Sequence, residues 1–188
     1  MPSGATHDRI TIRILPWLVL ISYIITRNGE LTLLIAGGFL FSGFMFGPDL
    51  DIYSIQFKRW GKLRYIWIPY QKSISHRSKL SHGFLIGTTL RILYISFILI
   101  FISIFIIAIS QILFGFSWNW QEFFINLWLK ITKEYGLEFI SLFCGLELGA
   151  MSHSLSDWSV SAYKKYKRKK NSTTKSKSKN IRSKKKKK

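Results

Sequence analysis

Cysteine is almost absent from this chain, and the single one, Cys144, lies within an apolar run. One cysteine excludes an intramolecular disulfide and the cysteine-rich spacings of zinc fingers, so Cys144 is interpreted as apolar filler. The sequence also lacks a Ser/His/Asp nucleophile motif, a glycine-rich phosphate loop and a dinucleotide-binding fingerprint. No small-residue cleavage site follows a short apolar core near the start, so we expect the first apolar run to be a retained membrane helix.

Acidic residues are scarce, since nine Asp and Glu stand against 28 Lys and Arg. The excess of bases is concentrated in residues 164–188, which hold fifteen Lys or Arg and no acid. Residues 1–163 hold the other thirteen bases and all nine acids, so this part is nearly balanced in charge. The low complexity of the basic segment predicts a disordered, Lys-rich tail over residues 164–188. Residues 1–163 are predicted to form one membrane-embedded domain.

Long apolar runs take the place of charge in residues 1–163. A membrane-spanning helix needs about 20 mostly apolar residues. The clearest run, residues 92–114, has no formal charge, and three further segments approach the required length. The pattern predicts an all-α integral membrane bundle of about four transmembrane helices, over residues 10–26, 31–47, 82–114 and 136–157.

The segments between these helices carry a consistent charge bias. Residues 58–79 hold seven Lys or Arg and no acid, which places this loop in the cytoplasm by the positive-inside rule. The basic tail should lie on the same side, so we expect a multi-pass protein with both termini cytoplasmic. On the outer side, residues 119–131 repeat Trp, Phe and Leu at helical spacing. This repeat predicts an amphipathic helix that lies in the membrane surface.

All four histidines fall at the cytoplasmic ends of the predicted spans. His153 and Asp157 are four residues apart and would share one helical face. Asp49 and Asp51 would point the same way from an extended segment. Neutral imidazole and carboxylate are the usual ligands of zinc, manganese and iron. We therefore predict a site for one or two divalent metal ions. Its candidate ligands are His7, Asp49, Asp51, His76, His82, His153 and Asp157.

Each candidate ligand also has an interpretation without a metal. Asp49 and Asp51 could cap a helix end, and His76 could be one more member of a basic loop. The co-location of all four histidines at one face favours the metal site. Arg77 and Lys79 lie between candidate ligands, where they could hold an anionic substrate or a carboxylate outside the ligand set.

Arg91 and Glu147 are two of the charged residues inside the predicted spans. Arg91 follows His82 by nine residues, and Glu147 precedes His153 by six. At about 1.5 Å of rise per residue, both should reach comparable depths from the same face. A charge inside an apolar helix is costly unless it is paired, so we predict that Arg91 and Glu147 interact.

Four blocks of sequence carry a family resemblance: "PSGATHDRIT", "GPDLDIYS", "PYQKSISHRSKLSHG" and "GAMSHSLSDW". Together they resemble a bacterial family of uncharacterised, predicted metal-binding membrane proteins, over residues 2–158. The order of His, PDxD, paired His and His-x₃-Asp is also similar to the SOS-regulated membrane-bound metal-dependent hydrolases. That group more often has His-Arg-Gly followed by Thr-His. The resemblance implies the same seven ligands and supplies no substrate.

Two hypotheses for function stay open. The first is a metal-dependent hydrolase acting on a phosphate-bearing or lipid-like substrate at the cytoplasmic membrane face, since a bound metal lowers the pKa of its water to about 7. The alternative is a non-enzymatic, metal-stapled membrane scaffold or a metal sensor. A transporter is disfavoured because the candidate ligands lie at one face and not at the midplane. The tail is expected to bind anionic lipids rather than nucleic acid, because no aromatic residue interleaves its bases after Tyr166.

Overall fold

A computed structural model describes residues 4–76 and 78–185, and every regular element within these ranges is helical. This confirms the all-α class. The elements in chain order are α1 (Gly4–Thr26), α2 (Gly29–Phe44), η1 (Pro48–Asp51), α3 (Ile55–Arg59), η2 (Gly61–Trp67), α4 (Ile68–Ser73), α5 (Lys79–His82), α6 (Ile86–Phe114), α7 (Trp120–Leu129), η3 (Lys130–Glu134) and α8 (Gly136–Lys185).

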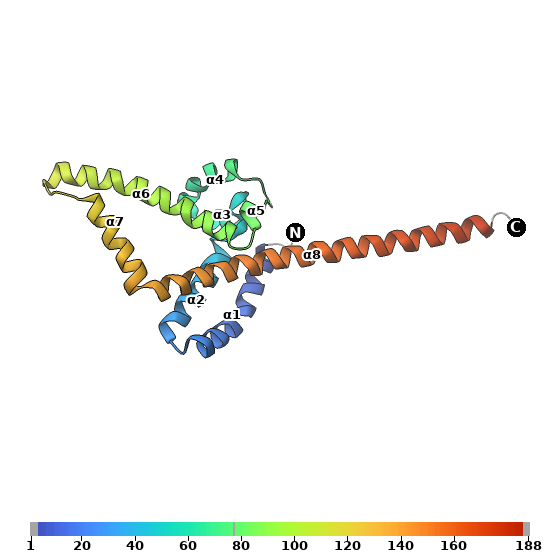
Figure 1. Ribbon diagram of the computed structural model, residues 1–188. Coiled ribbons are helices and arrows are strands. Elements are labelled where there is room, and N and C mark those ends of the chain that lie inside the picture. The colour runs from blue at the N-terminus through green and yellow to red at the C-terminus, as the bar shows by residue number, and fades with distance from the viewer. Residues whose placement is uncertain (1–3, 77, 186–188) are drawn as a thin grey trace.

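Helix α8 is the axis of the molecule, and the other elements lie to either side of it (Figure 1). Helices α1 and α2 pack against each other, and α2 makes the main contact with α8. On the other side, α6 projects outward, and α7 connects its far end to the start of α8. The short elements from η1 to α5 gather near the base of α6, and the C-terminal part of α8 extends beyond the body.

Three helical segments within the described residues are long and apolar enough to cross a membrane: Gly4–Thr26, Gly29–Asp51 and Ile86–Phe114. They correspond to the first three predicted spans. The fourth predicted span, residues 136–157, lies in α8 but does not reach the same apolarity, because it contains Glu138, Glu147 and His153. Four spanning helices are therefore more than length and composition support.

The basic tail differs from the prediction of disorder, because α8 continues through it to Lys185. Residues 164–185 contain neither Pro nor Gly, and Lys is a good helix former. A helix that is already nucleated extends more easily than a new one forms. Helix α8 crosses residue 163 without a break, and the division into two domains there stays a prediction.

The amphipathic segment predicted over residues 119–131 forms α7. The Asn119 side chain accepts a hydrogen bond from the Glu122 backbone N–H at 3.3 Å and so caps the helix. Its apolar side chains, among them Phe123 and Trp128, are exposed. The proposed position of α7 in a membrane surface stays a prediction.

A small aromatic core fixes the position of η1 near the base of α6. Leu50, between two candidate ligands, is fully buried, and so is Trp67. The Pro48 carbonyl lies 3.1 Å from the buried Ser81 hydroxyl, which ties η1 to α5. Because Leu50 is held in this core, the acids on either side of it have little freedom to move. The buried members of the core are Phe46, Leu50, Phe57, Trp67, Tyr70, Ile74 and Leu146.

Glycines allow α2 and α8 to approach closely. A Cβ atom on Gly145 would lie 2.2 Å from the Ile35 carbonyl oxygen, and one on Gly38 would lie 2.7 Å from the Leu142 carbonyl oxygen. Both distances fall well inside van der Waals contact, and the obstructing atoms are backbone. Small residues at a helix crossing are a common device for close packing of apolar helices.

Gly145→Ala should therefore destabilise the protein by about 1–3 kcal/mol, because the new methyl group forces the two backbones apart. Gly37→Ala, also within this helix pair, is the matched control. Apart from its chain neighbours and the nearby backbone of its own helix, no described atom lies within 4 Å of its added Cβ. Alanine is also the better helix former by about 1 kcal/mol. Unfolding in mixed micelles with increasing denaturing detergent measures both. Equal stability of the two variants would contradict the close packing.

Candidate metal centre

Four separate parts of the chain meet at one place near the base of α6. The first turns of α1 supply His7, and the middle of α8 supplies His153 and Asp157. Helix η1 supplies two acids, and the segment from α4 to α5 supplies two histidines. The structure brings all seven candidate ligands of the sequence analysis into this region. They form two groups, and one carboxylate reaches both.

The first group consists of His7, His153 and Asp157, and all three are buried. One ligand atom from each lies within 4.8 Å of those of the other two. The Nε2 atom of His7 is 3.4 Å from Oδ1 of Asp157, and the His7 and His153 rings stack with centroids 3.8 Å apart. The four-residue spacing of His153 and Asp157 places both side chains on the face of α8 that looks toward the start of α1.

The second group consists of Asp49, His76 and His82, which are half-buried. Their potential ligand atoms also lie within 4.8 Å of one another. The Nε2 atom of His82 is 3.8 Å from Oδ1 of Asp49, and the two imidazole rings are nearly perpendicular with centroids 5.4 Å apart. The turn that precedes α5 is what brings His76 beside His82.

Asp49 connects the two groups. Its Oδ1 atom faces His82 in the second group, and its Oδ2 atom lies 3.2 Å from Nε2 of His153 in the first. A carboxylate placed in this way can offer one oxygen atom to each group. The two groups are therefore one centre with a shared acid.

Several nitrogen and oxygen atoms of this centre lack hydrogen-bond partners. Buried polar atoms are normally hydrogen-bonded, and each exception calls for an explanation. Within the described residues, the buried atoms without such a partner include Asp49 Oδ1, His76 Nε2, His82 Nε2, both ring nitrogens of His153 and both carboxylate oxygens of Asp157. One nitrogen of His153 carries the proton of the neutral ring, and the other atoms could bind a cation. The centre therefore has the donor set of a metal site.

The spacing of these atoms also fits a metal. Two ligand atoms that each lie about 2.1 Å from one ion are separated by about 3.0–3.4 Å in octahedral or tetrahedral geometry. The contacts of 3.2 Å and 3.4 Å that His153 and His7 make with carboxylates fall in or near this interval. The 3.8 Å contact of His82 is slightly longer. Nitrogen and carboxylate oxygen together suit zinc, manganese or iron.

Asp51 has a different position from the other acids. It was predicted to point the same way as Asp49 from an extended segment, but η1 is a 3₁₀ helix that begins at Pro48 and turns the two acids apart. Asp51 Oδ1 is 2.9 Å from His76 Nδ1, and Oδ2 is 2.5 Å from the Ser81 hydroxyl. An acid bonded to Nδ1 leaves Nε2 of His76 available for a metal and fixes the ring orientation.

Two serines that the sequence analysis did not single out support the ligands. The fully buried Ser81 hydroxyl contacts Asp51 and lies 3.1 Å from His82 Nδ1. The Ser156 hydroxyl lies 2.7 Å from His7 Nδ1. Each serine is adjacent in sequence to a candidate ligand, which is the only signal that could have identified it.

Arg77 lies outside the described residues, and so does the side chain of Lys79. Arg91 and Glu147, which were predicted to interact, form no direct ion pair within the described residues. Arg91 instead donates to the Ser81 carbonyl at 3.0 Å and to the Thr88 hydroxyl at 2.9 Å. Glu147 accepts from the Leu85 backbone N–H at 3.0 Å. The two charges share the wall of one cavity.

The electrostatic environment of His82 favours its neutral form. Burial lowers the pKa of this imidazole below its ordinary value, although the carboxylates of Asp51 and Asp49 act in the opposite direction. A neutral imidazole is the form that binds metal. His82 is thus prepared for ligation at neutral pH.

One family matches the chain over residues 2–167, and its description reads "Uncharacterized metal-binding protein (DUF2227)". The matched range includes all seven candidate ligands. No curated protein and no solved structure matches the chain.

Proposed function

The chain belongs to this DUF2227 family of metal-binding proteins, and we propose that it holds two divalent metal ions at the cytoplasmic face of a membrane as a hydrolase. The proposed substrate is a phosphate-bearing or lipid-like ester. The observation that carries the proposal is the pair of three-residue groups whose unpartnered donor atoms share Asp49. The His/Asp pattern similar to that of SOS-regulated membrane-bound hydrolases agrees with it.

Two ions held by these groups would supply Lewis acidity and an acidified water, which are the requirements of metal-assisted ester hydrolysis. His7, His153 and Asp157 would hold one ion, and His76 and His82 would hold the other. Asp49 would bind both. The first ion would then have four protein ligands and the second three, with Asp49 counted for both. The second ion would keep a coordination position open for water or substrate, as in catalytic rather than structural zinc sites.

A polar cavity of about 250 Å³ gives access to the first group. His7, Asp49 and His153 form part of its wall, and Lys58 and Arg59 lie on the same wall. Arg59 is already engaged, since its guanidinium binds both carboxylate oxygens of Asp8 at 2.9 and 2.5 Å. The Lys58 ammonium lies 4.9 Å from the centre of the Tyr53 ring and has no carboxylate partner among the described residues. An ammonium beside a metal centre favours an anionic group such as a phosphate.

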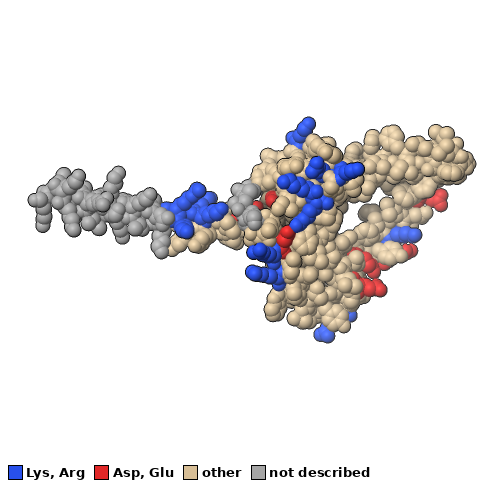
Figure 2. Space-filling model, turned by 180° about the vertical axis from the view of Figure 1, so that it is seen from behind, with Lys and Arg blue, Asp and Glu red and all other residues tan. Residues whose placement is uncertain are grey.

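Membrane integration is the second part of the proposal. Figure 2 shows Lys and Arg gathered near the part of the body from which α8 leaves, while the visible surface of the projecting part of α6 has none. Residues 92–129 contain no Lys or Arg, and the large apolar side chains of α6 are exposed, as expected for contact with lipid. In this orientation the metal centre lies at the inner face, and anionic lipids attract the basic end of α8.

We predict that a reporter placed after Arg64 or at the C-terminus is cytoplasmic and that one placed after Gln121 is external. The physical reason is the bias of Lys and Arg toward one side of the spans. Paired alkaline phosphatase and fluorescent-protein fusions measure this. A cytoplasmic reporter at Gln121 would overturn the proposed orientation.

The hydrolase is tested by metal-dependent turnover. Purified protein, stripped of metal and reloaded with zinc, manganese or iron, is assayed with p-nitrophenyl phosphate and bis-p-nitrophenyl phosphate. We expect turnover of at least one ester with metal and none without it or in His153→Ala. A reloaded protein that retains two ions but hydrolyses no phosphoester would defeat the hydrolase.

A metal-stapled scaffold is the second candidate, and the connectivity of the centre favours it. The ligands come from the start of α1, from η1, from the α4–α5 segment and from α8, so bound ions would tie four segments together. A scaffold needs full coordination and stability but no turnover. Metal-dependent stability without turnover on phosphoesters is the result that would select it.

A further inference from the structure

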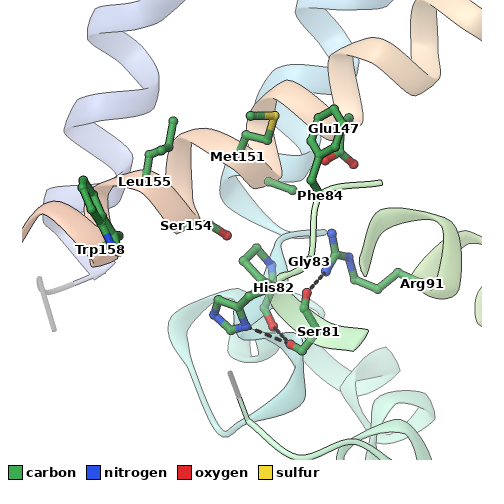
Figure 3. A pocket seen from close by; sticks show the side chains of 12 residues that line it. Ser81, His82, Gly83, Phe84, Arg91, Glu147, Met151, Ser154, Leu155 and Trp158 are labelled. Atoms are coloured by element: carbon green, nitrogen blue, oxygen red, sulfur yellow. Dashed lines mark hydrogen bonds between the residues drawn. The ribbon is translucent and has the colours of Figure 1, made fainter. Parts of the chain in front are cut away.

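A second cavity, of about 330 Å³, lies on the other side of the centre between α8 and the start of α6. Figure 3 shows it between α8 and the segment that carries His82, Gly83 and Phe84. His82 is the point of contact with the metal centre, because it lines the cavity and belongs to the second ligand group. The volume is at the lower end of the range for small-molecule sites, about 300–1,000 Å³.

The outer part of this cavity is apolar. Phe84, Leu155 and Trp158 lie along it and are each more than half exposed, and Met151 lies deeper between them and Glu147 (Figure 3). Exposed apolar side chains that surround a hollow are typical of sites for apolar ligands. In the proposed orientation these residues stand near the headgroup level of the inner leaflet, where an amphiphile could enter from the membrane.

The inner part of the cavity has polar atoms without partners. Arg91 is only 1% exposed and Glu147 only 6%, yet Arg91 Nε and Glu147 Oε2 make no hydrogen bond within the described residues. Figure 3 shows the Arg91 guanidinium directed toward the space below Glu147. A packing defect between apolar helices would not contain a buried donor and a buried acceptor. The cavity therefore has the mixed lining of a binding site, with few polar groups in an apolar wall.

We propose that this cavity binds the hydrocarbon chain of a phosphate-ester amphiphile whose ester group lies at His82 and the metal centre. This inference rests on the proposed function and names its substrate class. The hydrocarbon chain would contact Phe84, Met151, Leu155 and Trp158. The phosphate would face the centre, since His82 links the cavity to it and Lys58 borders the polar cavity on its far side. Arg91 Nε and Glu147 Oε2 would serve a polar group near the chain, such as a hydroxyl, which accepts and donates at once.

The protein offers a matched pair of variants. Ser154 and Ser152 both neighbour His153 on α8 and are both half-buried. Ser154 lines the proposed chain cavity, whereas Ser152 lines a different apolar hollow between α8 and α1. Ser154→Trp should fill the chain cavity, and Ser152→Trp should leave it open. The two substitutions add the same bulk at the same distance from a ligand.

The probe is a dodecylphosphonate with a diazirine near the end of its chain, incorporated into phosphatidylcholine nanodiscs with metal-loaded protein. The C–P bond resists hydrolysis, so labelling reports binding alone. Irradiation should label Phe84 or Trp158 in the wild type, because Met151 and Leu155 also border the α1–α8 hollow. Labelling should fall at least about ten-fold in Ser154→Trp and stay unchanged in Ser152→Trp, a difference of about 1.4 kcal/mol in binding. Metal content should be the same in all three proteins.

Excess unlabelled dodecylphosphonate should remove the labelling, and methylphosphonate should not, because it has no chain. Labels spread along α6 or placed in the α1–α8 hollow would overturn the proposal, as would equal labelling in both variants. The wild-type label positions decide the question even if Ser154→Trp fails to fold. If the cavity is labelled but no phosphoester is hydrolysed, the proposed hydrolase function is wrong and the proposed binding of the hydrocarbon chain is supported.

Discussion

Replacement of Asp49 with alanine is expected to remove both metal ions from the protein. Its two oxygen atoms face different groups, one toward His82 at 3.8 Å and one toward His153 at 3.2 Å. Loss of a hydrogen-bonded partner outside the ligand set already costs about 10–100-fold in metal affinity, and loss of a ligand should cost more. Bound metal, measured by plasma mass spectrometry after desalting, should fall from two equivalents toward none.

Three comparisons make this result specific. His153→Ala should remove one ion, and His76→Ala should remove the other. Asp8→Asn is the control. Asp8 is a carboxylate on the wall of the polar cavity beside the first group, and its partner is Arg59, not a candidate ligand. Its metal content should equal that of the wild type. If Asp49→Ala retains one full equivalent, the two groups do not share this acid.

Asp51→Asn should have a weaker and more selective effect. Asp51 contacts His76 Nδ1 and the Ser81 hydroxyl and belongs to neither ligand group. The substitution should weaken metal binding at the second group by about 10–100-fold and leave the first group loaded.

Chelation is expected to lower the stability of the folded protein by a large amount. A ligand that binds only the native state stabilises it by about 4 kcal/mol when its free concentration is 1,000 times its dissociation constant. Two ions should therefore contribute about 8 kcal/mol under such conditions. The free energy of unfolding in mixed micelles, measured with and without chelator, tests this.

The loss should also be local. Bound ions would join the start of α1 to α8 and η1 to the α4–α5 segment. Amide hydrogen exchange should therefore rise after chelation around His7 and over residues 75–82. Exchange should change little where Gly38 and Gly145 hold α2 against α8 through backbone contact. Unchanged stability and exchange after complete metal removal would contradict any structural contribution of the ions.

Much of the candidate centre could be predicted because its candidate ligands lie at helix ends. The apolar runs determine where each helix begins and ends, and the positive-inside rule predicts which ends share a side. The i, i+4 spacing of His153 and Asp157 then predicts a shared helical face, and the structure has both in the first group. Periodicity and charge are local properties, so the sequence displays them directly.

Other features depend on tertiary packing and could not be predicted. The division into two groups depends on the helical turn of η1, which directs Asp49 and Asp51 to different sides of the buried Leu50. Asp49 and Asp51 look alike in the sequence, and only packing distinguishes them, because Asp51 contacts His76 and Ser81 and lies outside both ligand groups. The depth argument predicted an interaction of Arg91 with Glu147. The structure places both at the wall of one cavity without an ion pair, because Ser81, Thr88 and Leu85 bind other atoms of the two side chains.

The fourth predicted span shows a further limit. Residues 136–157 read as a weak membrane segment, because apolar residues surround Glu138, Glu147 and His153. In the structure this part of α8 packs against α2, carries two candidate ligands of the first group, and forms one wall of the cavity proposed to bind a hydrocarbon chain. A helix with several polar functions cannot also be uniformly apolar, so hydropathy alone undervalues it.

The metal content of the wild-type protein tests the central claim most directly. The protein is purified in mild detergent, stripped with chelator, and titrated with zinc, manganese and iron in turn, with bound metal measured after desalting. Two groups with a shared carboxylate predict about two equivalents of at least one of these metals. Folded wild-type protein that binds none of the three would contradict the metal centre and leave the four histidines as ordinary polar residues at helix ends.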